Sequence, residues 1–96
     1  MKSMLVLTRR AGEAIIIGDL LEIRLLGVSE SRVQLAIRSL KADIPLLKLT
    51  LSTDQCVEIG DQIVVKAVRR AGEHSRIGIT APPDMPIVRG EKRPFN

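Results

Sequence analysis

Apolar and charged residues alternate in a short stretch of the first half of the chain, Leu21-Glu22-Ile23-Arg24-Leu25. Because successive side chains of a strand point to opposite faces, this alternation predicts a β-strand with one buried face. The same period of two recurs in residues 33–38, 63–68 and 76–80, and turn-forming residues lie between the runs at 18–19, 27–31, 60–61 and 71–73. Short strands separated by turns indicate an all-β sandwich or barrel with little or no helix.

The sequence repeats itself at a constant spacing. Ile17-Gly18-Asp19 returns as Ile59-Gly60-Asp61, and the apolar residues at 7, 21, 23, 35 and 37 return at 49, 63, 65, 77 and 79. We call this spacing, from Ile17 to Ile59, the repeat offset. One residue is then lost, so that residues 43–48 match residues 84–89 at a shortened offset. We therefore predict one compact domain, residues 1–96, made of two repeats at 4–48 and 46–91. The repeats overlap in a shared strand, residues 44–52, and residues 92–96 form a tail.

Composition excludes several classes of protein. Hydrophobic residues make up 45% of the chain, which is enough for a core, but its only aromatic residue is Phe95. The apolar runs are far shorter than the roughly 20 residues of a membrane-spanning helix, and no secretory signal is recognisable. One cysteine, Cys56, and one histidine, His74, cannot form a disulfide or a zinc cluster. We expect a cytoplasmic protein without a cofactor. An enzyme is the least favoured hypothesis, because no motif surrounds Cys56 as a nucleophile.

The two repeats differ most in their basic residues. The first repeat carries Arg9 and Arg10 where the second has Leu51 and Ser52, and Arg89 lies near the other end of the chain. The net charge of +4 suits a polyanionic partner without establishing one. Taken alone, the two neighbouring arginines are more typical of an edge strand that uses charge to deter aggregation than of an RNA site.

Four stretches together resemble the carbon storage regulator (CsrA/RsmA) family. They are Met4-Leu5-Val6-Leu7-Thr8-Arg9-Arg10-Ala11-Gly12-Glu13, Ile17-Gly18-Asp19, Arg76-Ile77-Gly78-Ile79-Thr80-Ala81-Pro82 and Ile87-Val88-Arg89-Gly90-Glu91. The resemblance implies a small bacterial RNA-binding regulator that recognises GGA motifs in hairpin loops of mRNA leaders and controls translation or mRNA stability. Small RNAs sequester such regulators. It also implies an intertwined pair of five-stranded sheets, here within a single chain.

In this family, each RNA site lies between the first strand of one subunit and the last strand of the other. The resemblance therefore assigns an RNA site to residues from the two ends of this chain: Leu7, Thr8, Arg9, Arg10, Ile87, Val88, Arg89 and Glu91. The second site is expected to be degenerate, at Lys48, Thr50, Leu51 and Ser52, with Lys48 in the place of Arg89. Lysine lacks the planar fork of arginine, so we predict one competent RNA site.

The chain departs from the family pattern in two respects. It has no room for a C-terminal helix, and it offers nine strands where two subunits would bring ten. Residues 44–52 span about 30 Å when extended, which is long enough to pair in one sheet and then cross to the other. We expect a monomer, with a strand-swapped homodimer as the alternative. The alternative function is a protein-interaction module of the same fold, bound by a regulatory protein antagonist, that no longer regulates messages directly.

Overall fold

The computed structural model describes residues 4–41, 46–71 and 74–90 and contains nine strands in that part of the chain. The first repeat supplies four strands, β1 (Leu5–Arg10), β2 (Ala14–Ile17), β3 (Leu21–Ser29) and β4 (Arg32–Ser39). Five more follow, β5 (Leu47–Ser52), β6 (Cys56–Ile59), β7 (Ile63–Ala71), β8 (His74–Thr80) and β9 (Ile87–Arg89). No helix able to cross a membrane occurs among these residues.

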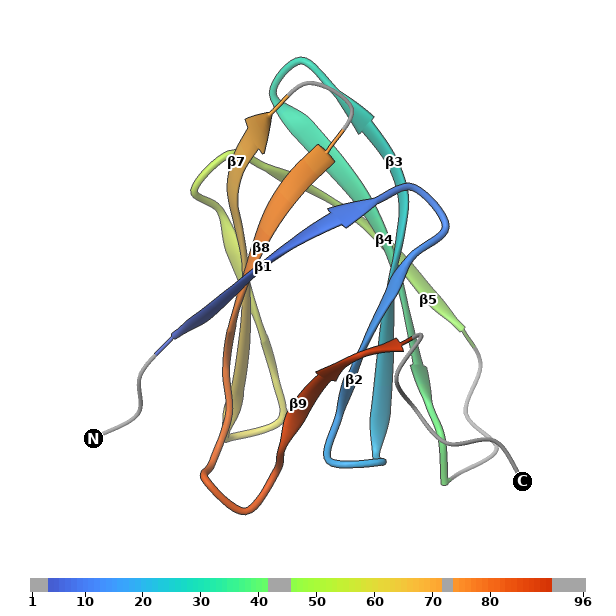
Figure 1. Ribbon diagram of the computed structural model, residues 1–96, viewed down its shortest axis with the longest axis vertical. Helices are drawn as coiled ribbons and strands as arrows, with labels where there is room; N and C mark the ends of the chain where they lie inside the picture. The colour runs from blue at the N-terminus through green and yellow to red at the C-terminus, as the bar shows by residue number, and fades with distance from the viewer. Residues whose placement is uncertain (1–3, 42–45, 72–73, 91–96) are drawn as a thin grey trace.

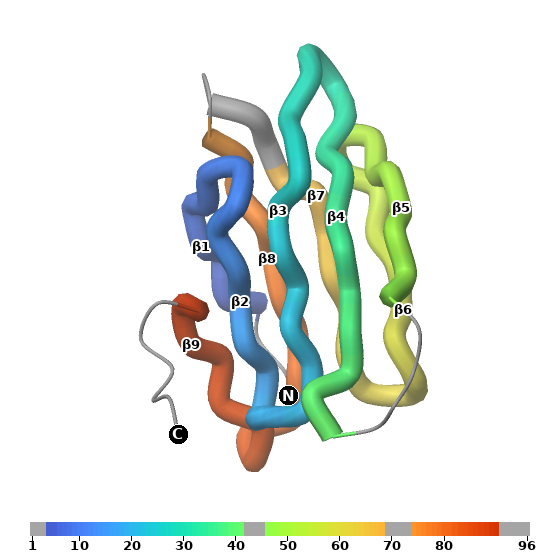
Figure 2. The backbone as a smooth tube through the Cα atoms, turned by 90° about the vertical axis from the view of Figure 1, so that its right-hand side faces the viewer, coloured from blue at the N-terminus to red at the C-terminus, as the bar shows by residue number. Residues whose placement is uncertain are grey.

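The strands form two antiparallel sheets that face each other (Figures 1 and 2). One sheet has the order β1-β8-β7-β6, and the other has the order β5-β4-β3-β2-β9. Each sheet therefore combines strands from both halves of the chain. The expected all-β, intertwined architecture is confirmed. One sheet, however, has four strands rather than five within the described residues.

The pairing registers show that the two halves are related by the repeat offset. Leu5 lies opposite Ile79 in β1 and β8, and Leu47 lies opposite Ile37 in β5 and β4. A register shift follows Leu25 in β3, and an equivalent shift follows Ala67 in β7. Because a slip of one residue would turn every side chain to the opposite face, this agreement defines a pseudo-twofold arrangement of the two halves.

Equivalent turns show the same relation in their hydrogen bonds. The Arg10 amide donates to Glu13 Oε1 at 2.7 Å, and the Ser52 amide donates to Gln55 Oε1 at 2.9 Å. Gly18 and Gly60 both adopt a positive φ, at 58° and 64°, in the β2–β3 and β6–β7 turns. Glycine occupies this left-handed region at little cost, which explains why Gly-Asp recurs in the sequence.

Aliphatic side chains fill the space between the sheets. The buried cluster consists of Leu7, Ile15, Ile17, Ile23, Leu25, Val33, Leu35, Ile37, Leu51, Ile63, Val65, Ala67, Ile77 and Ile79. These residues come from both sheets and from both halves of the chain. The two repeats therefore share one hydrophobic core, and neither could bury its own inner face without the other.

Two sequence predictions about individual segments need correction. Residues 27–29 are part of β3 rather than a turn, because a register shift after Leu25 lets the strand continue past Gly27. Within the predicted shared strand 44–52, the β-strand begins at Leu47 and not at Leu46, and residues 44–45 lie outside the described part. β5 pairs with β4 alone among the described strands, and the expected crossing of the shared strand to the other sheet stays a prediction.

Candidate nucleic-acid interface

The first and last strands of the chain lie at the same edge of the molecule. β1 is an edge strand of the four-stranded sheet, and β9 is an edge strand of the five-stranded sheet. Figure 2 shows both strands on one side of the sandwich, with β5 and β6 on the opposite side. The fold thus brings together the two stretches that the sequence assigned to one RNA site. Each of the two has one pairing neighbour among the described strands, which leaves backbone groups along its outer side.

Alternation along β1 divides its residues between the core and solvent. Leu7 and Arg9 are buried, at 7% and 5% exposure, whereas Thr8 and Arg10 are exposed. The side chain of Leu7 belongs to the core, so only its backbone is available at the edge. Of the four predicted site residues on this strand, Thr8 and Arg10 are therefore the two whose side chains are available to a ligand.

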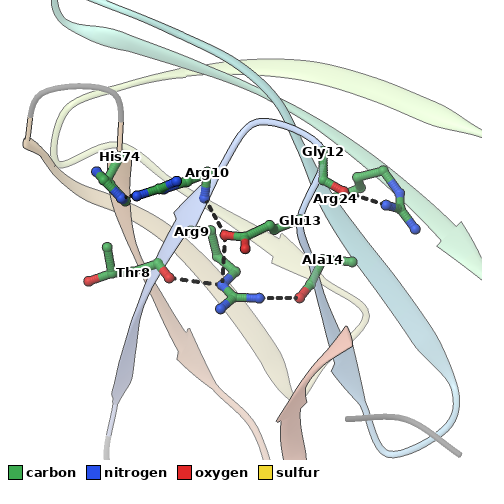
Figure 3. A network of polar contacts seen from close by, with 8 residues as sticks. All are labelled: Thr8, Arg9, Arg10, Gly12, Glu13, Ala14, Arg24 and His74. Carbon is green, nitrogen blue, oxygen red and sulfur yellow. Dashed lines mark hydrogen bonds and ion pairs between the residues drawn. The ribbon is translucent and has the colours of Figure 1, made fainter. Parts of the chain in front are cut away.

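Arg9 connects the edge strand β1 to strand β2 of the facing sheet (Figure 3). Its Nε donates to the Thr8 carbonyl at 2.8 Å, and its Nη1 donates to the Ala14 carbonyl in β2 at 3.3 Å. The carboxylate of Glu13 approaches the same guanidinium, with Nε and Oε1 3.9 Å apart. Burial and these contacts make Arg9 a structural residue beneath the edge. Its counterpart Leu51 is equally buried, at 4% exposure. The leucine at this equivalent position was the sequence signal that the side chain faces inward.

Arg10 projects on the outer face of the four-stranded sheet. Its Nε donates to His74 Nε2 at 2.6 Å, across the pairing of β1 with β8. Arg76 is exposed on the same face, directly opposite Thr8. Sequence reasoning did not place Arg76 or His74 at the site. The alternation within residues 76–80 indicates that Arg76 faces outward, and the pairing of β8 with β1 brings both residues beside Thr8 and Arg10. Two exposed arginines therefore flank Thr8 at this edge.

β9 contributes a second exposed arginine-bearing edge. Ile87 is half-buried, Val88 is 39% exposed and Arg89 is exposed. Arg89 lies opposite Ile15, and the following residue, Gly90, packs tightly against Ala14. A Cβ atom at Gly90 would lie 2.9 Å from the Cβ of Ala14, so this approach requires glycine. Ala14 is also the residue whose carbonyl binds Arg9, which brings β9 close to the Arg9 contacts. Glu91 lies outside the described residues.

The residues predicted to form a degenerate second site lie at the opposite edge. Lys48, Thr50 and Ser52 are exposed on β5, and Leu51 is buried. Lys48 lies opposite Ala36, which is the register position of Val6 rather than that of Arg89. The placement of Lys48 therefore differs from the expectation, because β5 follows the repeat offset and not the shortened one. Among the described strands, nothing takes the place beside β6 that β9 takes beside β2.

The polar groups at these edges do not form a metal centre. Within the described residues, no group of three or more His, Cys, Asp or Glu side chains is placed to hold a metal ion. The only buried side-chain oxygen or nitrogen without a partner there is Ser75 Oγ, opposite Arg9 on β8. The arrangement is suited to binding an anionic ligand by exposed guanidinium groups and strand backbone.

Comparison with known proteins agrees with the repeat and with the fold. The sequence pattern of the CsrA family, described as the global regulator protein family, matches residues 4–42 and again residues 46–92. The "Translational regulator CsrA" of Geobacter metallireducens is 46% identical over 46 residues, which cover 48% of this chain and 59% of the relative. The "Translational regulator CsrA" of Geobacter sulfurreducens is 46% identical over 46 residues, which cover 48% of this chain and 58% of the relative.

These matches span somewhat more than half the length of the curated relatives. No solved structure matches the chain. The family pattern, in contrast, accounts for nearly all of the residues that the structure describes, once in each half. The chain therefore belongs to the CsrA global regulator protein family and carries the family pattern twice.

Proposed function

We propose that this protein is an RNA-binding post-transcriptional regulator with a single RNA site at the edge formed by β1 and β9. The ligand is a GGA-containing hairpin loop in an mRNA leader, and small RNAs that carry the same loop compete for it. The observation that supports this best is the position of exposed Arg10, Arg76 and Arg89 around two edge strands that come from opposite ends of the chain. Two relatives named as translational regulators point to the same role.

The chemistry of the edge suits an RNA loop better than a helix. Unpaired bases can stack on guanidinium planes and hydrogen-bond to exposed strand backbone, whereas the bases of an RNA helix are hidden in a groove that is too narrow to enter. The chain cannot use the aromatic stacking of many single-strand binders, because it has no Trp or Tyr and its one Phe is residue 95. Arginine and backbone must therefore provide both affinity and base recognition.

A single site follows from the inequality of the two edges. At the second edge, Leu51 and Ser52 replace the two arginines of β1, and no described strand takes the place of β9. Because the second edge lacks both the arginines of β1 and a strand like β9, it offers no comparable set of phosphate contacts. We therefore expect one hairpin to bind per chain.

Titration of a fluorescently labelled GGA hairpin into the full chain tests this proposal. Arg89→Ala is expected to weaken binding by about ten- to a hundredfold, since a hydrogen bond to a charged group contributes about 1.5–3 kcal/mol. Arg32→Ala is the matched control, because Arg32 is also exposed but lies on β4, remote from the β1–β9 edge. The slope of log affinity against log salt concentration should fall by about one, the equivalent of one phosphate contact, for Arg89→Ala and not for Arg32→Ala.

Three results would contradict the proposal. Equal losses for Arg89→Ala and Arg32→Ala would show that binding is general electrostatic attraction and not a site. Two hairpins bound per chain would disprove the single site. Equal affinity for GGA and scrambled loops would instead support the protein-interaction module as the function of this fold.

A further inference from the structure

The strand β6 leaves one edge of the four-stranded sheet open in the described structure. β6 pairs with β7 on one side, and no described strand lies on its other side. In the pseudo-equivalent position, β2 is covered by β9. The effect is visible in burial: Ile15 and Ile17 on β2 are 1% and 0% exposed, whereas their counterparts Val57 and Ile59 on β6 are only partly buried.

The backbone of β6 is oriented to accept a further strand. The Gly18 amide donates to the Pro86 carbonyl at 2.8 Å, which marks the pair 18/86 as hydrogen-bonded across β2 and β9. Because hydrogen-bonded pairs alternate in an antiparallel ladder, the amide of Ile16 also points toward β9. By the repeat offset, the amides of Glu58 and Gly60 point outward from β6.

A cavity extends this open edge at the β6–β7 turn. It has a volume of about 550 Å³, and its lining includes Leu21, Ile59, Gly60, Ile63 and Met85. In the covered half of the molecule, Met85 packs over Gly18, with its Cβ 3.1 Å from where a Cβ of Gly18 would lie. At Gly60 no described atom comes within 4 Å of the equivalent point. The open edge therefore includes a place for one bulky apolar side chain that precedes the added strand.

The charge of the open edge identifies the kind of occupant. Asp54, Glu58 and Asp61 are exposed along β6 and its two turns. Asp54 approaches Lys66, with Oδ1 and Nζ 4.0 Å apart, whereas Glu58 and Asp61 have no ion-pair partner within the described residues. These three carboxylates make the edge unfavourable for RNA, although Lys41 lines the same cavity as Asp61. The acidic edge also disfavours a second copy of the chain as the occupant. Pairing of β6 with the β6 of that copy would bring the two Glu58 side chains together or would place Asp54 opposite Glu58.

We propose that the β6 edge binds an extended segment of another protein as an additional antiparallel strand. The segment carries a basic residue opposite Glu58, an apolar residue opposite Ile59 and a bulky apolar residue that enters the cavity. Main-chain hydrogen bonds to Glu58 and Gly60 provide affinity, and the alternate side chains provide specificity. This site lies at the edge opposite the proposed RNA site and does not depend on RNA binding.

A peptide designed from the covered half tests the proposal. The probe is a capped octapeptide with the sequence of residues 83–90 in which Val88→Lys places a basic side chain opposite Glu58. Binding to the full chain is measured by fluorescence anisotropy, and the amides that shift are located by NMR. We expect shifts at residues 56–60 and not at residues 14–17, where β9 already pairs. N-methylation of the lysine should abolish binding, because that residue exchanges both backbone bonds with Glu58.

Charge reversal distinguishes this strand site from general attraction of a basic peptide. Glu58→Lys should weaken binding roughly three- to tenfold, and a peptide with Val88→Glu should recover affinity for that variant. Glu30→Lys is the matched control, since Glu30 is an exposed carboxylate in the β3–β4 turn. Equal effects of the two variants would overturn the proposal, as would peptide shifts confined to other residues.

Two further outcomes would also overturn it. Protection of the Glu58 and Gly60 amides from exchange in the free monomer would show that a segment of the same chain already covers β6. A concentration-dependent dimer whose formation is prevented by Glu58→Lys would show that a second copy is the occupant. Neither outcome would affect titration of the GGA hairpin, so this inference and the proposed RNA function fail independently.

Discussion

At the scale of single residues, the two neighbouring arginines of β1 have different roles. Arg9 is buried and contacts the Thr8 and Ala14 carbonyls and the Glu13 carboxylate, whereas Arg10 is exposed. The alternation of a strand separates them, although they are chemically identical and adjacent in sequence. Arg9 therefore stabilises the contact of β1 with β2 of the facing sheet, and Arg10 is available to a ligand.

This difference predicts opposite effects of the same substitution. Arg9→Leu should lower the free energy of unfolding by about 1–3 kcal/mol, because the buried Ala14 carbonyl loses its donor. Arg10→Leu should leave stability within about 0.5 kcal/mol and weaken hairpin binding instead. Urea unfolding and RNA titration of both variants check this. A larger loss of stability for Arg10→Leu than for Arg9→Leu would contradict the assignment of Arg9 as structural.

The burial of Arg9 shows what the sequence could and could not predict at the candidate site. The resemblance selected β1 and β9, and the structure places these two strands on one side of the molecule. It did not separate inward from outward side chains, since Arg9 has a charge that ordinarily belongs on the surface. The apolar counterpart Leu51 carried that information, because a position that accepts leucine in the core faces inward in both halves.

At the scale of the strands, the repeat offset and the shortened offset predict two different registers for the middle of the chain. Lys48 matches Val6 at the repeat offset and Arg89 at the shortened one. The structure follows the repeat offset, because β5 pairs with β4 over six residues, whereas the β9-like alternative offers three. More ladder hydrogen bonds and the burial of Leu51 favour the longer pairing. The sequence pattern alone fits both registers.

The contact between β9 and β2 gives a prediction at this scale. Gly90→Ala introduces a Cβ 2.9 Å from the Cβ of Ala14, so β9 must shift although no RNA-binding group is removed. We expect weaker hairpin binding with a salt dependence like that of the unmodified chain, because the charges are retained. The double variant Ala14→Gly/Gly90→Ala removes that clash but leaves the added Cβ 3.2 Å from the carbonyl oxygen of residue 14, so it should recover part of the affinity. Titrations over a range of salt concentrations measure both effects.

Failure of the double variant to bind more tightly than Gly90→Ala would show that the close approach of Gly90 to Ala14 does not position β9. The Gly60→Ala variant provides a comparison. It imposes left-handed strain of roughly 1–2 kcal/mol on a turn without a described neighbour, and it lies far from the RNA edge. It should affect stability but not hairpin binding.

At the scale of the whole molecule, the two repeats contribute to one hydrophobic core. The radius of gyration is 12.4 Å, close to the value of about 12.5 Å expected for a single domain of this length. The core residues of each half pack between sheets that contain strands of both halves. Unfolding of either half therefore exposes the core of the other. Partial unfolding is unfavourable, because it exposes much apolar surface to water and gains the chain entropy of only one half.

Substitutions in the core test this cooperativity. Ile37→Ala and Ile79→Ala are pseudo-equivalent and should each lower the free energy of unfolding by about 2–5 kcal/mol. Both should shift the same single transition in urea, whichever half is observed. Amide exchange of β3 and β7, one from each repeat, provides the two independent probes. Two separate transitions, each sensitive to only one of the substitutions, would contradict a shared core.

The presence of both repeats within one chain also affects how the molecule can evolve. In a symmetric dimer of identical chains every substitution is made twice, once in each protomer, and both copies of a site change together. Here equivalent positions such as Arg9 and Leu51, or Ile16 and Glu58, are encoded separately. A mutation therefore alters one edge and leaves the other untouched. Selection can act on each half alone, as long as the core that both halves need is preserved.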